Sequence, residues 1–214
     1  MLKMRVLVLA VACLVFSPSA MAQQKDWKSW YGHAAIGYSS PEGAAGDALD
    51  GGWNINAGAA YNPDDWPVGL FAELGFNTFD VNRRTTETLE ATDGDVDIWS
   101  LTGGFLWTTR NEGLVNFYTE GGIGWYLIDV TLTDPALALV PGFCGWYWCV
   151  PPGVVETDAI VGSDSTIRFG YNAGIGLAFT VGKGSQIYLE AKYHWAQTTN
   201  KTTEYLPIVL GFRW

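Results

Sequence analysis

The chain has little of several features that common protein classes require. After its first 22 residues it contains no uninterrupted apolar run of about 18 residues, which argues against a helical membrane span there. Lys and Arg number 12 against 22 Asp and Glu, so no basic surface is available to neutralise nucleic-acid phosphates. Three cysteines and two histidines leave few positions for metal binding or nucleophilic catalysis.

What the chain does contain is many aromatic residues and glycines. Aromatic residues make up 14% of it, with 11 Trp and 26 Gly, while charged residues make up only 16%. This combination suits short alternating strands better than a helical core.

The first 22 residues resemble a secretory signal peptide. Lys3 and Arg5 precede an apolar run over 6–16, and Ala20-Met21-Ala22 forms a small-residue cleavage site. We expect cleavage after Ala22 and a single domain over 23–214. A lipoprotein signal at Cys13 is the weaker alternative, because Ala10 stands where that signal has Leu.

Eight segments alternate between apolar and mixed faces, as β-strands with two different environments do. They are 30–38, 53–61, 68–79, 97–107, 115–127, 167–181, 187–195 and 204–214. Their lengths are near the nine to eleven residues with which a tilted strand crosses a membrane.

The connections alternate between long and short. Long ones cover 39–52, 80–96 and 128–166, short ones cover 62–67, 108–114 and 182–185, and 197–203 is of medium length. Transmembrane barrels have this pattern, with periplasmic turns and external loops. The sequence therefore predicts an all-β, eight-stranded antiparallel up-and-down transmembrane barrel. A soluble lipocalin-like barrel is the alternative, but its apolar face would point inward.

The end of the chain supports the same interpretation. The segment 187–195, a short polar connection and the segment 205–214 resemble the eight-stranded outer-membrane β-barrel family, similar to OmpA and OmpX. Phe212 and the terminal Trp214 resemble the assembly signal of that family, which implies the barrel assembly machinery as a partner. The resemblance implies a bacterial outer-membrane location and no catalytic residues.

Ionisable residues on the polar faces are expected inside the barrel. They are Glu73, Glu120, Arg168, Glu190, Lys192 and Arg213. An eight-stranded barrel encloses little more than side chains, so these charges must pair with one another. We expect a polar plug, and a gated small pore is the alternative.

The two histidines test an enzymatic interpretation. Some eight-stranded barrels are lipid A deacylases or palmitoyl transferases, and such a deacylase has Ser two residues after its His. Here Ala196 follows His194 at that spacing, and alternation turns His194 inward. We therefore expect His33 and His194 to be structural and the protein not to be an enzyme.

The longest connection carries an unusual cysteine pair. Cys144 and Cys149, with four residues between them in an exported segment, predict a disulfide. Around them stand the aromatic residues Phe143, Trp146, Tyr147 and Trp148. An exposed aromatic cluster marks a contact surface, unless it folds back as a lid over the barrel.

The long connections are also acidic. Residues 129–166 hold five Asp and Glu and no Lys or Arg. Oxygen-rich loops can bind Ca²⁺ or Mg²⁺, but the run Asp93-Gly-Asp95-Val-Asp97 lacks the full spacing of a calcium loop. A solvated acidic surface without a metal site is the simpler interpretation.

Together these features predict a monomeric, non-enzymatic outer-membrane barrel without a cofactor, with a structural or surface-interaction role. Its expected partners are outer-membrane lipid, lipopolysaccharide and an extracellular ligand. A small passive porin-like channel is the alternative, and a lipid A-modifying enzyme is less well supported.

Overall fold

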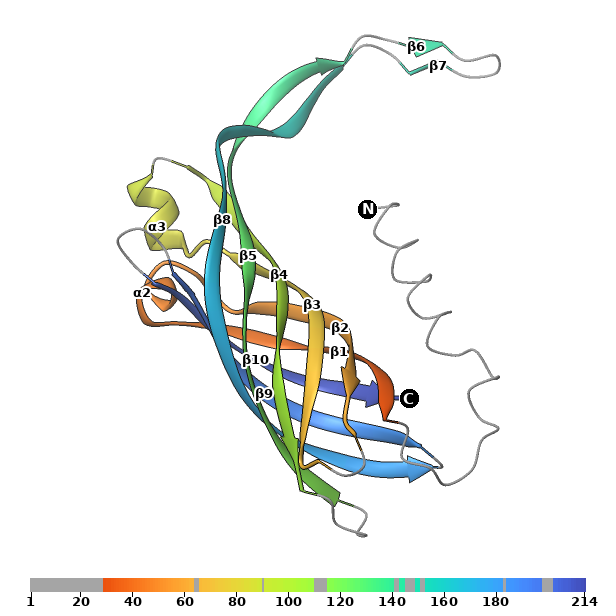
Figure 1. Ribbon diagram of the computed structural model, residues 1–214. Coiled ribbons are helices and arrows are strands. Elements are labelled where there is room, and N and C mark those ends of the chain that lie inside the picture. Colours follow the sequence, from red (N-terminus) through yellow and green to blue (C-terminus); the bar gives the residue numbers. More distant parts are fainter. Residues whose placement is uncertain are drawn as a thin grey trace.

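The chain folds into a closed barrel of eight strands, each antiparallel to its neighbours (Figure 1). The computed structural model describes residues 29–63, 66–89, 91–109, 115–140, 143–144, 149–150, 153–182, 184–197 and 202–214. The barrel strands are β1 (Trp30–Glu42), β2 (Gly52–Tyr61), β3 (Val68–Asp80), β4 (Asp93–Thr108), β5 (Val115–Val140), β8 (Gly153–Gly182), β9 (Ser185–Gln197) and β10 (Thr202–Arg213). The predicted fold class is confirmed. The predicted signal peptide, residues 1–22, lies outside the described residues.

Short elements occupy three of the connections. These are the helices α2 (Gly43–Gly46) and α3 (Arg83–Thr88), and the two-residue strands β6 (Phe143–Cys144) and β7 (Cys149–Val150). Asn82 caps α3, because its side chain accepts a hydrogen bond from the Thr85 N–H. Neither of the helices described is long and apolar enough to cross a membrane.

The connection predicted over 128–166 is mostly strand, so the prediction of a loop there is wrong. β5 continues to Val140 and β8 begins at Gly153, and the two remain paired over this length. The sequence argument ended both strands where the apolar alternation ends, near Leu127 and Ile167. A strand pair outside the membrane needs no outward apolar face to satisfy its backbone hydrogen bonds, and the Val, Thr and Ile residues of this segment favour strands.

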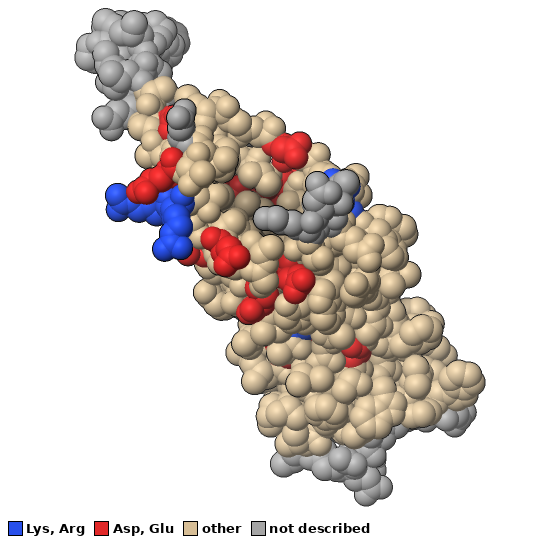
Figure 2. Space-filling view, turned by 90° about the vertical axis from the view of Figure 1, so that its left-hand side faces the viewer, with Lys and Arg blue, Asp and Glu red and all other residues tan. Residues whose placement is uncertain are grey.

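The outer surface of the barrel is apolar, as predicted. Ile36, Leu101 and Ile123 are each more than half exposed. Aromatic rings gather near the loop end. There the ring centre of Phe76 lies 5.3 Å from that of Trp53 and 4.6 Å from that of Trp99. Figure 2 shows a nearly uncharged wall with acidic side chains gathered toward one end. Such a surface requires an apolar surrounding and excludes a soluble barrel.

The last residue closes the barrel. Gly32 N–H donates to Trp214 O at 3.1 Å, and Trp214 N–H donates to Gly32 O at 3.0 Å. Above this closure, β1 and β10 pair from His33 and Arg213 up to Glu42 and Glu204. The barrel wall therefore has no unpaired edge at its seam.

Candidate functional site

The centre of the barrel holds buried charges around Lys192 on β9. Lys192 Nζ lies 2.9 Å from Glu73 Oε1 on β3 and 3.2 Å from Glu190 Oε1 on its own strand. It also pairs with Glu120 on β5. All four side chains are at most 6% exposed. Three carboxylates from three strands thus converge on one ammonium, which ties opposite walls together.

Arg213 forms the second part of this network. Its Cζ lies 4.0 Å from the ring centre of Tyr118 and 4.5 Å from that of Tyr188. Its Nη2 lies 4.0 Å from Glu190 Oε2, and the Tyr118 hydroxyl donates to the same oxygen at 2.7 Å. A guanidinium between two ring faces is stabilised without water. The structure therefore gathers Glu73, Glu120, Glu190, Lys192 and Arg213 into one cluster.

Arg168 lies outside this cluster. It stands opposite Tyr126 on β5, six residues from Gly174, the β8 partner of Lys192. Six residues of strand separate them by roughly 20 Å. Arg168 forms no ion pair with any residue in the described part of the chain. Its placement in the network is wrong, because alternation assigns a face to a residue but not its depth in the barrel.

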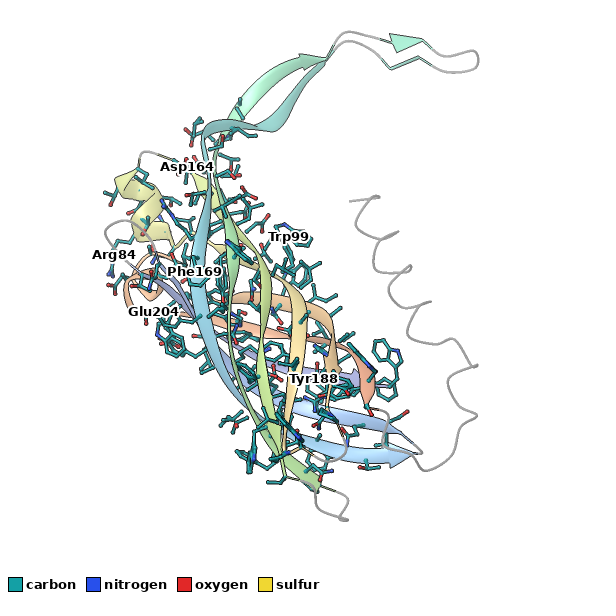
Figure 3. The ribbon with its side chains drawn as sticks, viewed as in Figure 1. Arg84, Trp99, Asp164, Phe169, Tyr188 and Glu204 are labelled. Atoms are coloured by element: carbon teal, nitrogen blue, oxygen red, sulfur yellow. The ribbon has the colours of Figure 1, made fainter. Side chains whose placement is uncertain are left out.

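Apolar layers lie on both sides of the charge cluster, which the sequence did not predict. One lies near the turn end and contains Ala35, Ala60, Phe71, Leu106, Tyr118, Ala178, Tyr188 and Val209. The other lies near the loop end and contains Phe79, Val81, Val96, Ile98, Tyr126, Ile128, Ala196 and Tyr205. Figure 3 labels Tyr188 within the barrel.

Facing glycines are the sequence signal for these interior tyrosines. Tyr118 pairs with Gly176, and a Cβ on that glycine would lie 2.2 Å from the tyrosine ring. Tyr188 pairs with Gly211, where the distance would be 2.3 Å. The missing side chain leaves room for a ring to lie across the barrel. A tyrosine facing a glycine on the polar face is therefore a signal for lumen filling.

A small cavity lies between the two layers. It has a volume of about 10 Å³ and lies among Asn54, Asn56, Glu73, Asn77, Lys192 and His194. That is about the room that one water molecule occupies. A conducting path would have to cross both apolar layers.

Both histidines point into this interior. His33 Nε2 lies 3.1 Å from Glu73 Oε2, within hydrogen-bonding distance. His194 Nδ1 lies 3.0 Å from the Tyr126 hydroxyl. The His194 ring also stacks on the ring of Tyr205, with 4.7 Å between the two ring centres. His33 and His194 are 7% and 4% exposed. Neither imidazole reaches the lipid-facing surface, where a lipid-modifying histidine would have to act.

The β5–β8 hairpin forms the second candidate site, because it extends far beyond the other strands (Figure 1). Beyond Asp129, the remaining residues of β5, up to Val140, add up to roughly 40 Å of strand. At its far end β6 pairs with β7, and Cys144 is the register partner of Cys149. The side chains of Phe143, Cys144 and Cys149 and the whole of 145–148, with Trp146, Tyr147 and Trp148, lie outside the described residues. The disulfide and the contact cluster stay predictions.

An acidic row crosses the outer face of β3, β4 and β5 at the base of this hairpin. Asp80 pairs with Asp95, and Asp97 pairs with Asp129. Partial burial, followed by the charges of Asp93, Asp80 and Asp97, raises the pKa of Asp95. Within the described ranges, no three His, Cys, Asp or Glu residues are placed to hold a metal ion.

A closed antiparallel barrel with an apolar outside and a packed polar centre is a transmembrane β-barrel. The model of the outer membrane protein beta-barrel domain matches residues 8–214, and the chain belongs to this family. It is a protein of the bacterial outer membrane.

Two solved structures share the fold. Neisserial surface protein A, from Neisseria, is 13% identical, with a TM-score of 0.54 over 88% of this chain and 98% of its own. A major outer membrane protein from Thermus thermophilus is 11% identical, with a TM-score of 0.52 over 86% of this chain and 98% of its own. No curated protein matches the chain.

Proposed function

We propose that this protein is a non-enzymatic outer-membrane barrel that carries the β5–β8 hairpin as a contact surface outside the cell. The observation that carries this proposal is the contrast between its two parts. The lumen is filled by two apolar layers around a charge cluster. The hairpin, in contrast, is far longer than spanning a membrane requires.

The proposal includes how the protein reaches and occupies the membrane. A signal peptide over 1–22 exports the chain, and Phe212 and Trp214 engage the barrel assembly machinery. The monomer then sits in lipid and lipopolysaccharide, with the short turns and both ends of the mature chain in the periplasm. The outward aromatic and aliphatic side chains support this placement.

The test separates contact from conduction. Residues 134–158 are replaced by a short Gly-Asn turn, which leaves the membrane-spanning part of every strand in place. We expect this variant to assemble, to show unchanged heat-modifiable migration and to lose binding of cells to a host-cell or abiotic surface. The intact protein in planar bilayers should show no steady conductance.

Two results would contradict the proposal. Stable channels from the intact protein would favour the passive channel. If the hairpin variant kept its surface binding, and the envelope weakened only when the whole gene was deleted, the protein would have a structural role and no contact role.

A further inference from the structure

A groove opens on the outer wall of the barrel at the turn end. It has a volume of about 510 Å³, and Tyr61, Trp66, Val68, Leu70 and Phe105 line most of it. This volume is within the range of roughly 300–1,000 Å³ that ligand pockets in proteins commonly have. None of the described residues around the groove is charged, so it accommodates hydrocarbon.

The strand register forms the floor of this groove. Tyr61 on β2 pairs with Leu70 on β3, and Leu70 pairs with Phe105 on β4, so the three side chains form a row across neighbouring strands (Figure 1). Leu70 and Phe105 are each more than half exposed, whereas their chain neighbours Phe71 and Leu106 are buried in the lumen. The floor of the groove is therefore part of the wall that faces lipid.

Trp66 stands at the rim of the groove, in the connection between β2 and β3, and is 67% exposed. Backbone hydrogen bonds anchor both ends of this connection. Asn62 N–H donates to Ser29 O at 2.6 Å, just before β1, and Thr108 N–H at the end of β4 donates to Pro67 O at 3.4 Å. A site whose backbone is held before the ligand arrives loses less entropy on binding.

The groove runs from the membrane boundary toward the centre of the bilayer. At the turn end the ring centres of Trp30 and Tyr61 lie 4.9 Å apart, and Trp and Tyr gather where a membrane meets water. Phe105 lies two residues beyond Trp107, the partner of Val68, and is thus deeper along the wall by roughly 7 Å. A ligand that fills the groove therefore has a polar end at the boundary and an apolar tail directed inward.

We propose that this groove holds one phospholipid of the periplasmic leaflet, with an acyl chain along Leu70 and Phe105 and the headgroup beside Trp66. The strands beneath the groove, β2, β3 and β4, are each paired on both sides, so they offer no edge to a peptide. An acyl chain between the ring and the wall gains dispersion contacts on two sides, whereas a lipid elsewhere on the wall gains them on one. The inference rests on the proposed placement of the turn end in the periplasm and names a lipid and its site.

The first test uses a photoreactive lipid. The mature protein is placed in nanodiscs of phosphatidylethanolamine and phosphatidylglycerol that contain a trace of phosphatidylethanolamine with a diazirine in the middle of one acyl chain. Leu189 and Leu210 are the matched positions, because they are outward leucines of similar exposure on β9 and β10. After illumination, peptide mass spectrometry should find about fivefold more label on Leu70 than on either of them. Even labelling of the three leucines would overturn the inference.

The second test removes the rim of the groove. Trp66→Ser should lower the labelling of Leu70 about fivefold, because the acyl chain loses the ring that holds it. Ordinary lipid contact gives the opposite result, since a smaller side chain uncovers the wall. Trp66→Phe is the matched control, which retains an aromatic ring and should label within about twofold of the unchanged protein. Unchanged or stronger labelling of Leu70 in Trp66→Ser would reject the site.

The third test fills the groove from its floor. Leu70→Trp should lower the labelling of Phe105 about fivefold, because the larger ring occupies the place of the acyl chain. Leu74→Trp is the matched control, since Leu74 is an outward leucine of similar exposure on the same strand and does not line the groove. Both variants should keep heat-modifiable migration. Equal labelling of Phe105 in the two variants would show that the groove holds no lipid.

These outcomes are separable from a failure of the proposed function. The hairpin deletion should leave the labelling of Leu70 unchanged, because the groove lies at the other end of the barrel. If no outward leucine is labelled, the proposed placement of the barrel in lipid fails, and the groove inference fails with it. If labelling is even over the wall while the deletion abolishes surface binding, only the groove inference fails.

Discussion

Lys192 Nζ and Glu73 Oε1 lie 2.9 Å apart, although 119 residues separate them in the sequence. They stand on β9 and β3, which are not neighbours in the barrel, so their contact crosses the lumen. Together with Glu120 on β5, this pair connects strands on opposite sides of the barrel, as the hydrogen bond from Tyr118 on β5 to Glu190 on β9 also does.

Lys192→Met should therefore destabilise the barrel strongly. The change leaves three buried carboxylates without their shared cation, and breaking a buried pair costs about 3–5 kcal/mol. The urea midpoint of the protein refolded in lipid should fall accordingly. Arg84→Met, at an exposed position on α3, is the control and should leave the midpoint unchanged. Equal midpoints for both variants would show that water screens the cluster.

Gly176→Ala tests the packing of the turn-end layer. The added Cβ would lie 2.2 Å from the Tyr118 ring, so the ring must shift from Arg213. Overpacking of this kind costs typically about 1–3 kcal/mol. Gly121→Ala is the matched control, since its nearest neighbour would be 3.7 Å away. A loss of stability in both variants would point to strand flexibility instead of the ring contact.

Local sequence pattern predicted the barrel well because alternation reports the two environments of each strand directly. Leu206, Ile208 and Leu210 face outward while Val209 is buried, as period two requires. The terminal Trp214 also stands at the seam, consistent with a role in closing the barrel. The alternation along β10 depends only on neighbouring residues in the chain, whereas the seam joins Trp214 to the distant Gly32.

The alternation of residues along each strand could not predict how deep an inward side chain lies in the barrel or which side chain it pairs with across the lumen. Arg168 and Lys192 share the inward face, but the stagger of the strands sets them at different heights. The strands beyond Leu127 and Ile167 were missed because the outward-facing apolar residues end there, although Val130 and Leu132 still pack against the loop-end apolar layer. The first error concerns the stagger of the strands and the second concerns how far they continue outside the membrane, and a single sequence displays neither directly.

The acidic row predicts a pH dependence outside the membrane. The pKa of Asp95 is raised in the folded protein, so the stability it contributes is present below the ordinary Asp pKa and is lost as pH rises through the raised value. Asp95→Asn should therefore raise the free energy of unfolding at neutral pH by roughly 0.2–1 kcal/mol, because it removes a like charge between paired strands, and the urea midpoint should rise with it. Below about pH 4 the two proteins should unfold alike. A variant advantage that persists at low pH would contradict the charge explanation.

Deletion of Trp214 should impair assembly. The residue supplies two backbone hydrogen bonds to Gly32 at the seam, and its ring covers that glycine. Without it the first and last strands meet with an unpaired end, which is costly in lipid. We expect much less folded protein in the outer membrane, measured by heat-modifiable migration, with export of the precursor unchanged. Trp214→Phe should restore assembly, and normal assembly of the truncated chain would refute the proposed signal.

Cys144→Ser with Cys149→Ser should affect only the tip of the hairpin. The two residues are register partners in the β6–β7 pair, so a bond between them would close a ring of only a few residues. The chain-entropy model gives about 2 kcal/mol for such a ring, confined to the hairpin. Barrel migration on gels should therefore stay heat-modifiable and unchanged, while added protease should cut the hairpin of intact cells faster. Failure of the double variant to assemble would make the bridge part of the folding core. Unchanged protease sensitivity would mean that the cysteines are not paired or that the tip is protected by packing.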